Sequence, residues 1–123
     1  MRVEGAGYYV LVVDDDLQMR KLLTGALSSW GYEAVSVGTG EEALEELTRR
    51  CPDVLISDLI MPGMSGEELA RRCASTCPDT RLIFVSGYAG ADLRDLGVSQ
   101  VVYLPKPVPM ASLRITLQRL LQH

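Results

Sequence analysis

The chain has 123 residues, of which 47% are hydrophobic and 23% charged, the size and balance of one ordinary globular domain. This composition excludes wholesale disorder, and no apolar run approaches the roughly 20 residues of a membrane span. Twelve basic against sixteen acidic residues give a net charge of −4, so no basic patch favours direct binding to nucleic acid. The three cysteines lack zinc-site spacing, and their odd number favours the reducing cytosol, so we expect a cytoplasmic protein with no membrane contact of its own.

Short apolar runs alternate with stretches of helical periodicity along the chain. Residues 9–13 form an apolar run that stops at an acid, which predicts a strand buried on both faces. Apolar residues then recur at helical spacing from Met19 to Trp30, and Gly31 follows where a glycine commonly ends a helix. Residues 32–37 predict a second strand.

Capping boxes at residues 39–42 and 65–68 predict the starts of two more helices. These helices end close to Pro52 and Pro78, because proline does not continue a helix. The second of them carries Cys73 and Cys77, which we expect to pack rather than to bind a metal.

Three further apolar runs, at residues 54–57, 82–85 and 101–104, predict strands of the same kind. A short helix is expected at 91–96, and leucines stripe a last helix. Five β-then-α units predict a doubly wound α/β fold, with helices on both faces of a parallel sheet. In such a sheet the functional site lies beyond the carboxyl ends of the strands.

Polar residues follow the strands at that expected edge. Asp14-Asp15-Asp16 follows the first strand, Asp58 the third, Ser86 ends the fourth and Lys106 follows the fifth. A single acid there is usually solvated or caps a helix, and we expect Asp16 to cap the next helix. Carboxylates from two strands, however, repel one another unless a cation lies between them. The cluster therefore predicts a Mg²⁺ site with room for a phosphoryl group, beside the charge of Lys106.

These residues stand in motifs that resemble the receiver domain of two-component response regulators. The motifs are Val12-Val13-Asp14-Asp15-Asp16, Asp58-Leu59-Ile60-Met61-Pro62-Gly63-Met64-Ser65-Gly66, Val85-Ser86-Gly87 and Lys106-Pro107. The stretches Ser86-Gly87-Tyr88-Ala89 and Leu104-Pro105-Lys106-Pro107 are most similar to receivers of hybrid histidine kinases. The resemblance implies a flavodoxin-like (βα)5 sandwich with a five-stranded parallel sheet in the order 2-1-3-4-5. It makes residues 1–8 an N-terminal tail and residues 9–122 a single receiver domain.

The resemblance also implies a phosphoryl transfer. Asp58 would accept the phosphoryl group from the phosphohistidine of a histidine kinase or a histidine phosphotransfer protein, forming an acyl phosphate. Lys106 would neutralise charge on the phosphoryl oxygens, and Ser86 would hydrogen-bond to the group. Such a domain is a signalling phosphoacceptor that catalyses only its own phosphorylation and dephosphorylation, and not an enzyme that turns over a metabolite.

By the same resemblance, Mg²⁺ would be held by the carboxylates of Asp14, Asp15 and Asp58 and by the backbone carbonyl of Ile60, with one member of the Asp14–Asp15 pair often acting through a water. Asp15 is the expected direct ligand of the acidic pair. Asp15-Asp16 remains an alternative pair, although a strand that ends at Val13 favours Asp14-Asp15.

Two positions bear on what happens after phosphorylation. Tyr103 matches the aromatic switch position of the family, with a half-buried strand aromatic as the alternative. Ile60 is apolar where many relatives carry a polar residue, and Tyr88 is bulky. Because water must approach at both positions, slow loss of the phosphoryl group is our hypothesis.

Other functions remain open at this point. Asp14 and Asp16 have the spacing of the nucleophile and the acid–base residue in haloacid-dehalogenase-like phosphohydrolases. A degenerate receiver that only binds proteins is a further alternative. The sequence also leaves open whether the receiver stands alone or belongs to a larger kinase, which target it has downstream, and whether Ile115 contributes to a homodimer.

Overall fold

The computed structural model describes residues 4–87 and 101–121. In chain order its elements are β1 (Tyr9–Val13), α1 (Leu17–Ser29), β2 (Glu33–Val37), α2 (Gly40–Arg49), β3 (Val54–Ser57), α3 (Gly66–Thr76), β4 (Arg81–Ser86), β5 (Val101–Pro105) and α4 (Met110–Leu121). The helix predicted at 91–96 lies outside the described residues. The other predicted helices and strands are confirmed, with small shifts at their ends.

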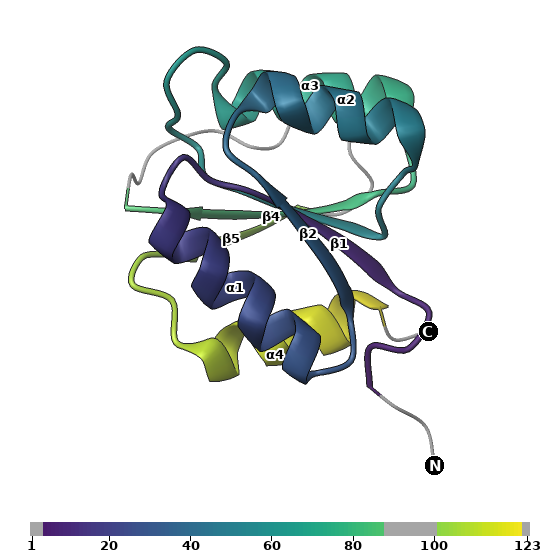
Figure 1. The fold of residues 1–123 in the computed structure, drawn as a ribbon, viewed down its shortest axis with the longest axis vertical. Helices are drawn as coiled ribbons and strands as arrows, with labels where there is room; N and C mark the ends of the chain where they lie inside the picture. The colour runs from purple at the N-terminus through teal and green to yellow at the C-terminus, as the bar shows by residue number, and fades with distance from the viewer. Residues whose placement is uncertain (1–3, 88–100, 122–123) are drawn as a thin grey trace.

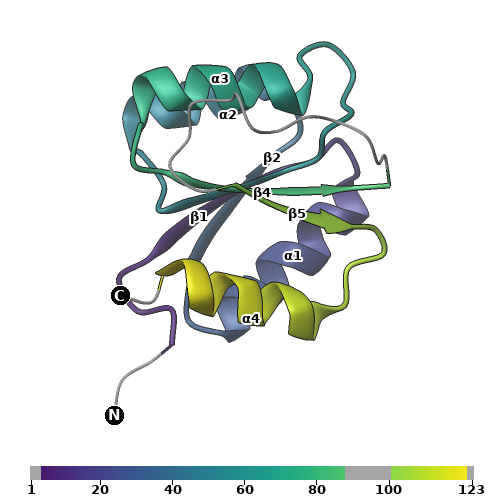
Figure 2. The same cartoon turned by 180° about the vertical axis from the view of Figure 1, so that it is seen from behind.

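The five strands form one parallel sheet in the order β2-β1-β3-β4-β5, as predicted. Helices α2 and α3 cover one face, and α1 and α4 cover the other (Figures 1 and 2). The strand order reverses between β1 and β3, which lie side by side in the centre. In sheets of this type the ligand site lies at that reversal, beyond the carboxyl ends of the two strands.

The central strands are apolar throughout because both of their faces are covered. Every residue of β1 and β3 is buried. In β1, Tyr9, Leu11 and Val13 pack into the core with α2 and α3, while Val10 and Val12 pack into the core with α1 and α4. This alternation places two hydrophobic cores on a single sheet, one on each face.

The caps predicted at Thr39 and Ser65 form hydrogen bonds to the starts of their helices. Thr39 Oγ1 accepts from the Glu42 N–H at 3.1 Å, and the Glu42 carboxylate accepts from the Gly38 N–H at 3.2 Å. Ser65 Oγ accepts from the Glu68 N–H at 3.1 Å. These bonds satisfy N–H groups that a helix leaves without an internal partner, and they set where α2 and α3 start relative to the sheet.

The segment that precedes β1 contacts the body of the domain. The Gly5 N–H donates to the Trp30 carbonyl at 3.0 Å, just past the end of α1. The Glu4 carboxylate pairs with Arg114 of α4 at 2.9 Å, and the Tyr8 hydroxyl donates to the Leu121 carbonyl at 3.2 Å. Residues 4–8 therefore run across the ends of α1 and α4.

The cysteines show one feature that the sequence analysis does not predict. Cys51, in the connection between α2 and β3, and Cys77, which caps the end of α3, form a disulfide. Cys73 is a buried free thiol, and burial raises its pKa to about 11. Packing of Cys73 and Cys77 is confirmed, but cysteine count and spacing carried no sign that Cys51 meets Cys77 in space. Among the described residues, no helix has the length and apolar character to cross a membrane.

Candidate functional site

The two central strands deliver carboxylates to the same edge of the sheet. Asp14 follows β1 and Asp58 follows β3. The backbone continues the ladder there, since the Asp58 N–H donates to the Val13 carbonyl and the Asp14 N–H to the Val37 carbonyl, both at 3.2 Å. Carboxylate oxygens of Asp14, Asp15 and Asp58 all lie within 4.8 Å of one another. The predicted acidic cluster is thus assembled at the point where the strand order reverses.

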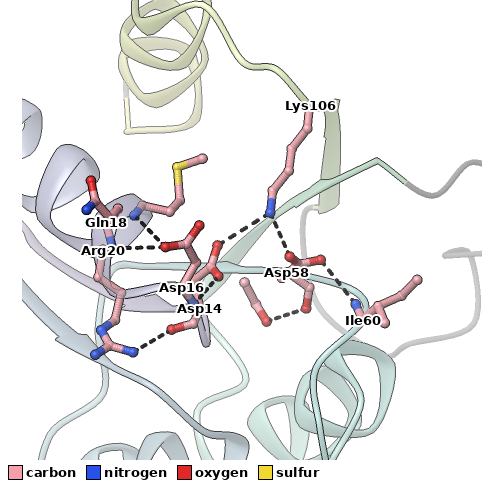
Figure 3. Close-up of polar contacts among 9 residues, drawn as sticks. Asp14, Asp16, Gln18, Arg20, Asp58, Ile60 and Lys106 are labelled. Atoms are coloured by element: carbon pink, nitrogen blue, oxygen red, sulfur yellow. Dashed lines mark hydrogen bonds and ion pairs between the residues drawn. The ribbon is translucent and has the colours of Figure 1, made fainter.

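The three consecutive aspartates have different surroundings. Asp14 is only 3% exposed, whereas Asp15 is exposed. Asp16 directs its carboxylate to α1, where it accepts from the N–H groups of Gln18 and Met19 at 2.9 and 3.4 Å (Figure 3). Asp16 therefore caps the helix, as predicted, and Asp14 and Asp15 are the two that join Asp58 in the cluster.

The cluster is electrostatically unfavourable for Asp14. Burial raises its pKa, and the neighbouring charges of Asp58 and Asp15 add to the rise. A hydrogen bond from the Asp16 N–H at 2.9 Å and the charge of Lys106 act in the opposite direction without cancelling it. A further cation stabilises a site of this kind, because it offsets the mutual repulsion of the carboxylates.

Lys106 lies between the carboxylates of the two central strands. Its Nζ is 2.8 Å from Asp58 Oδ2 and 3.6 Å from Asp14 Oδ2 (Figure 3). Burial alone would lower the pKa of Lys106, but the hydrogen bond to Asp58 and the charge of Asp14 outweigh it and raise the pKa. Pro105 and Pro107 flank the lysine, and the Lys106–Pro107 peptide bond is cis.

The β3–α3 loop holds the other oxygen of Asp58. Asp58 Oδ1 accepts from the Ile60 N–H at 3.1 Å, while the Ile60 side chain is 61% exposed beside it. The first residue of α3, Gly66, lies so close that a Cβ there would be 2.2 Å from the Asp58 carbonyl oxygen. Gly66 belongs to a predicted capping box and to the motif that begins at Asp58, but neither pattern predicts this close approach.

Arg20 is a second residue that the sequence analysis missed. Its Nη1 donates to the Asp14 carbonyl at 2.8 Å, and a Cβ on Gly38 would lie 2.6 Å from the same nitrogen. Arg20 therefore ties α1 to the end of β1 under the acidic cluster. The available signal was its position one helical turn after the cap Asp16, on the side that faces the strand end.

Ser86 and Tyr103 also lie on strands that lead to this edge. Ser86 ends β4 opposite Pro105 of β5, so its backbone is level with the residue before Lys106. The position of the Ser86 side chain lies outside what the structure describes. Tyr103 is half-buried in β5 opposite Phe84 and packs against the core with α2 and α3. Its switching role stays a prediction.

The similarity to known proteins extends over most of the chain. The family model for the response regulator receiver domain matches residues 10–118. Sensor kinase CckA of Brucella abortus is 39% identical over 118 residues, which cover 92% of this chain and 12% of CckA. The chain thus spans a small part of that curated relative.

Solved structures agree with this family. The chemotaxis protein CheY4 of Vibrio cholerae superposes with a TM-score of 0.83 at 32% identity, covering 94% of this chain and 100% of that one. Response regulator TrrA of Thermotoga maritima, solved in complex with Mg²⁺ and BeF, gives 0.79 at 31% identity, covering 93% and 99%. With the sheet order, the acidic cluster and these matches together, the chain belongs to the response regulator receiver domains.

Proposed function

We propose that this receiver domain is a phosphoacceptor. Asp58 takes a phosphoryl group from the phosphohistidine of a histidine kinase or a histidine phosphotransfer protein, and the product shifts the domain between two conformations. One observation carries the proposal: Lys106 Nζ lies 2.8 Å from Asp58 Oδ2 inside a cluster of three carboxylates. An ammonium group held against a buried carboxylate at a strand end is an arrangement suited to receiving an anionic group.

The transfer uses the residues around Asp58 as follows. An Asp58 oxygen forms a bond to phosphorus while the phosphorus–nitrogen bond breaks, and the histidine nitrogen keeps the electron pair. The Ile60 N–H and Lys106 Nζ hold the two carboxylate oxygens of Asp58 in place before reaction. Lys106 then pairs with a phosphoryl oxygen, and the Ser86 hydroxyl hydrogen-bonds to the group from the end of β4.

The donor set also fits a magnesium ion. The carboxylates follow the ends of two strands, and the site is open to solvent at Asp15. Such a set of oxygen ligands suits a small cation that keeps several of its waters. Asp14, Asp15 and Asp58 would hold it, with the Ile60 carbonyl as a fourth donor. Bound there, the ion would neutralise charge on the phosphoryl oxygens. The complex of TrrA with Mg²⁺ and BeF supports this assignment by similarity.

Tyr103 is the proposed readout residue. It lies in β5, three residues before Lys106, and is half-buried against the core. A change at Ser86 and Lys106 on phosphorylation therefore reaches it through adjacent strands. The switch would be a population shift, biased by contacts that only the phosphorylated form makes.

A phosphohydrolase that uses Asp14 and Asp16 is not favoured. The Asp16 carboxylate is engaged by two N–H groups of α1 and caps that helix. If Asp14 and Asp16 were the catalytic pair, the ion pair between Lys106 and Asp58 would also have no role in the reaction. A module that only binds proteins would not need the acidic cluster together with its lysine.

The cellular setting belongs to the same proposal. We place the domain at residues 9–122, preceded by residues 1–8, in the cytoplasm, with a histidine kinase or phosphotransfer protein as its donor. The similarity to CckA favours a receiver of the hybrid-kinase type. Ile115, an exposed apolar residue on α4, is available to a homodimer contact.

Intact mass spectrometry tests the proposal directly. Wild-type protein and Asp58→Asn are incubated with acetyl phosphate, with and without Mg²⁺. One added phosphoryl group is expected, only with Mg²⁺ and only on the wild type. If no adduct forms, Mg²⁺-dependent stabilisation by beryllofluoride is measured by thermal melting. Absence of both the adduct and that stabilisation would overturn the proposed function.

A further inference from the structure

The disulfide lies at the opposite edge of the sheet from the acidic cluster. Cys51 precedes β3 and Cys77 caps the end of α3, so both stand at the amino-terminal ends of β3 and β4. Asp58 follows the other end of β3. The disulfide therefore takes no part in the chemistry proposed for Asp58.

The two sulfurs differ in their access to solvent. Cys51 is exposed, whereas Cys77 is 2% exposed. Their Cα atoms are 5.6 Å apart, which lies within the usual range for a disulfide. An external reagent therefore reaches Cys51 first, and Cys77 is close enough to displace it without movement of the backbone.

The surroundings accommodate the reduced pair as well as the bonded one. The Cys51 sulfur lies 3.8 Å from the Thr76 carbonyl oxygen, and the Cys77 sulfur lies 3.7 Å from the Leu47 carbonyl oxygen. Each thiol, once reduced, has a hydrogen-bond acceptor within reach.

A pocket of about 200 Å³ opens beside the pair. Cys51, Pro52, Asp53, Cys77, Asp79 and Thr80 line it. Two of these residues are acids and none is basic, while the neighbouring Arg50 lies over the Tyr9 ring and pairs with Glu33, away from this pocket. The pocket is therefore small, has sulfur in its wall and favours a cationic occupant over an anionic one.

We propose that Cys51 and Cys77 form a thiol–disulfide exchange site for small cationic disulfides. The Cys51 thiolate attacks one sulfur of the reagent, whose other half leaves as a thiolate. The Cys77 thiolate then attacks the Cys51 sulfur and releases the second half. The two cysteines lose two electrons and two protons in total, and the disulfide reagent is reduced to two thiols.

The third cysteine provides an internal control. Cys73 lies on α3 one turn before Cys77 and is completely buried. Burial also raises its pKa to about 11, so little of it is present as the reactive thiolate. A reagent that modifies cysteines without regard to the site would modify the pair and Cys73 together, after unfolding. A site-specific reaction leaves Cys73 untouched.

The experiment starts from fully reduced protein, desalted and mixed with cystamine or with glutathione disulfide at equal concentration. Acid-quenched samples are digested and mapped by mass, with fragmentation to separate Cys73 from Cys77. In the wild type we expect a transient cysteamine adduct on Cys51, followed by the Cys51–Cys77 disulfide. Cys77→Ser should retain the adduct on Cys51, and Cys51→Ser should leave Cys77 unmodified over the same period.

Cystamine should react several-fold faster than glutathione disulfide at low salt, and added salt should narrow the difference. Equal rates of modification at Cys77 in Cys51→Ser and at Cys51 in the wild type would overturn the order of attack. Faster reaction with glutathione disulfide would overturn the charge preference, and disulfides formed through Cys73 would overturn the site. None of these readouts uses phosphorylation, so the proposal stands or falls independently of the role of Asp58.

Discussion

Lys106 Nζ lies 2.8 Å from Asp58 Oδ2 and 3.6 Å from Asp14 Oδ2, so one ammonium group serves carboxylates from both central strands. Replacing it removes the ammonium group that pairs with both of these largely buried carboxylates. Lys106→Gln should therefore slow phosphorylation of Asp58 by acetyl phosphate by about 10²-fold. The rate is followed by intact mass, with Lys106→Arg as the control that keeps the charge. An unchanged rate in Lys106→Gln would contradict this role.

The charge of Asp14 destabilises the folded state when no cation is bound, because burial and the adjacent acids raise the pKa of its carboxyl group. Asp14→Asn keeps an oxygen that accepts from the Asp16 N–H and removes one negative charge. We expect it to raise the free energy of unfolding at neutral pH by about 1 kcal/mol without Mg²⁺. Urea titrations with and without Mg²⁺ measure this, and the variant should lose the stabilisation that Mg²⁺ gives the wild type.

Asp15, which is exposed, provides the control variant for the urea titrations of Asp14→Asn. Asp15→Asn should leave the metal-free stability nearly unchanged, because its charge is solvated, while weakening the response to Mg²⁺. A loss of metal-free stability in Asp14→Asn would show that its charge is compensated in the fold.

Gly66 and Gly25 provide a matched pair of glycine substitutions. A Cβ at Gly66 would lie 2.2 Å from the Asp58 carbonyl oxygen, whereas a Cβ at Gly25 in α1 meets nothing within 4 Å. Gly66→Ala should lower the free energy of unfolding by about 3 kcal/mol through this clash. Gly25→Ala should raise it by about 0.5–1 kcal/mol through helix propensity. Urea unfolding distinguishes the two, and equal effects would refute the close approach.

Ile60 bears on how long the phosphoryl group survives. The Ile60 N–H donates to the Asp58 carboxylate, and the apolar side chain of Ile60 is exposed beside Asp58. Ile60→Gln should shorten the lifetime of the phosphorylated form several-fold, because a polar side chain helps to position the attacking water. Decay of the mass adduct after removal of acetyl phosphate measures the lifetime, with Ile60→Leu as the control. A half-life of only seconds in the wild type would refute slow hydrolysis.

The disulfide should also affect stability. It closes a segment with a sequence separation of 26, which contains β3, Asp58 and α3. Loss of loop entropy in the unfolded chain should raise the melting temperature of the oxidised form by about 10 °C or more over the reduced form. Thermal melts with and without a reductant check this. Cys77→Ser should have the melting temperature of the reduced wild type, both with and without the reductant.

Much of this domain follows from local sequence. The apolar runs predicted β1 and β3 because strands covered on both faces have no polar positions. The capping boxes at Thr39 and Ser65 predicted the starts of α2 and α3, because their hydrogen bonds span only three residues. The clustering of Asp14, Asp58 and Lys106 also followed, since the carboxyl ends of parallel strands meet at one edge.

Other relationships depend on contacts between distant segments, and local pattern carries no record of them. The sequence predicted that Asp16 caps the next helix, but only packing buries Asp14, leaves Asp15 exposed and brings both to Asp58. The sequence contained three cysteines, but the pairing of Cys51 with Cys77 required α3 to end beside the start of β3. The sequence by itself thus determined which chemistry the chain carries and at which edge. The tertiary structure decided which atoms meet there, because burial and distance arise only when separate elements pack.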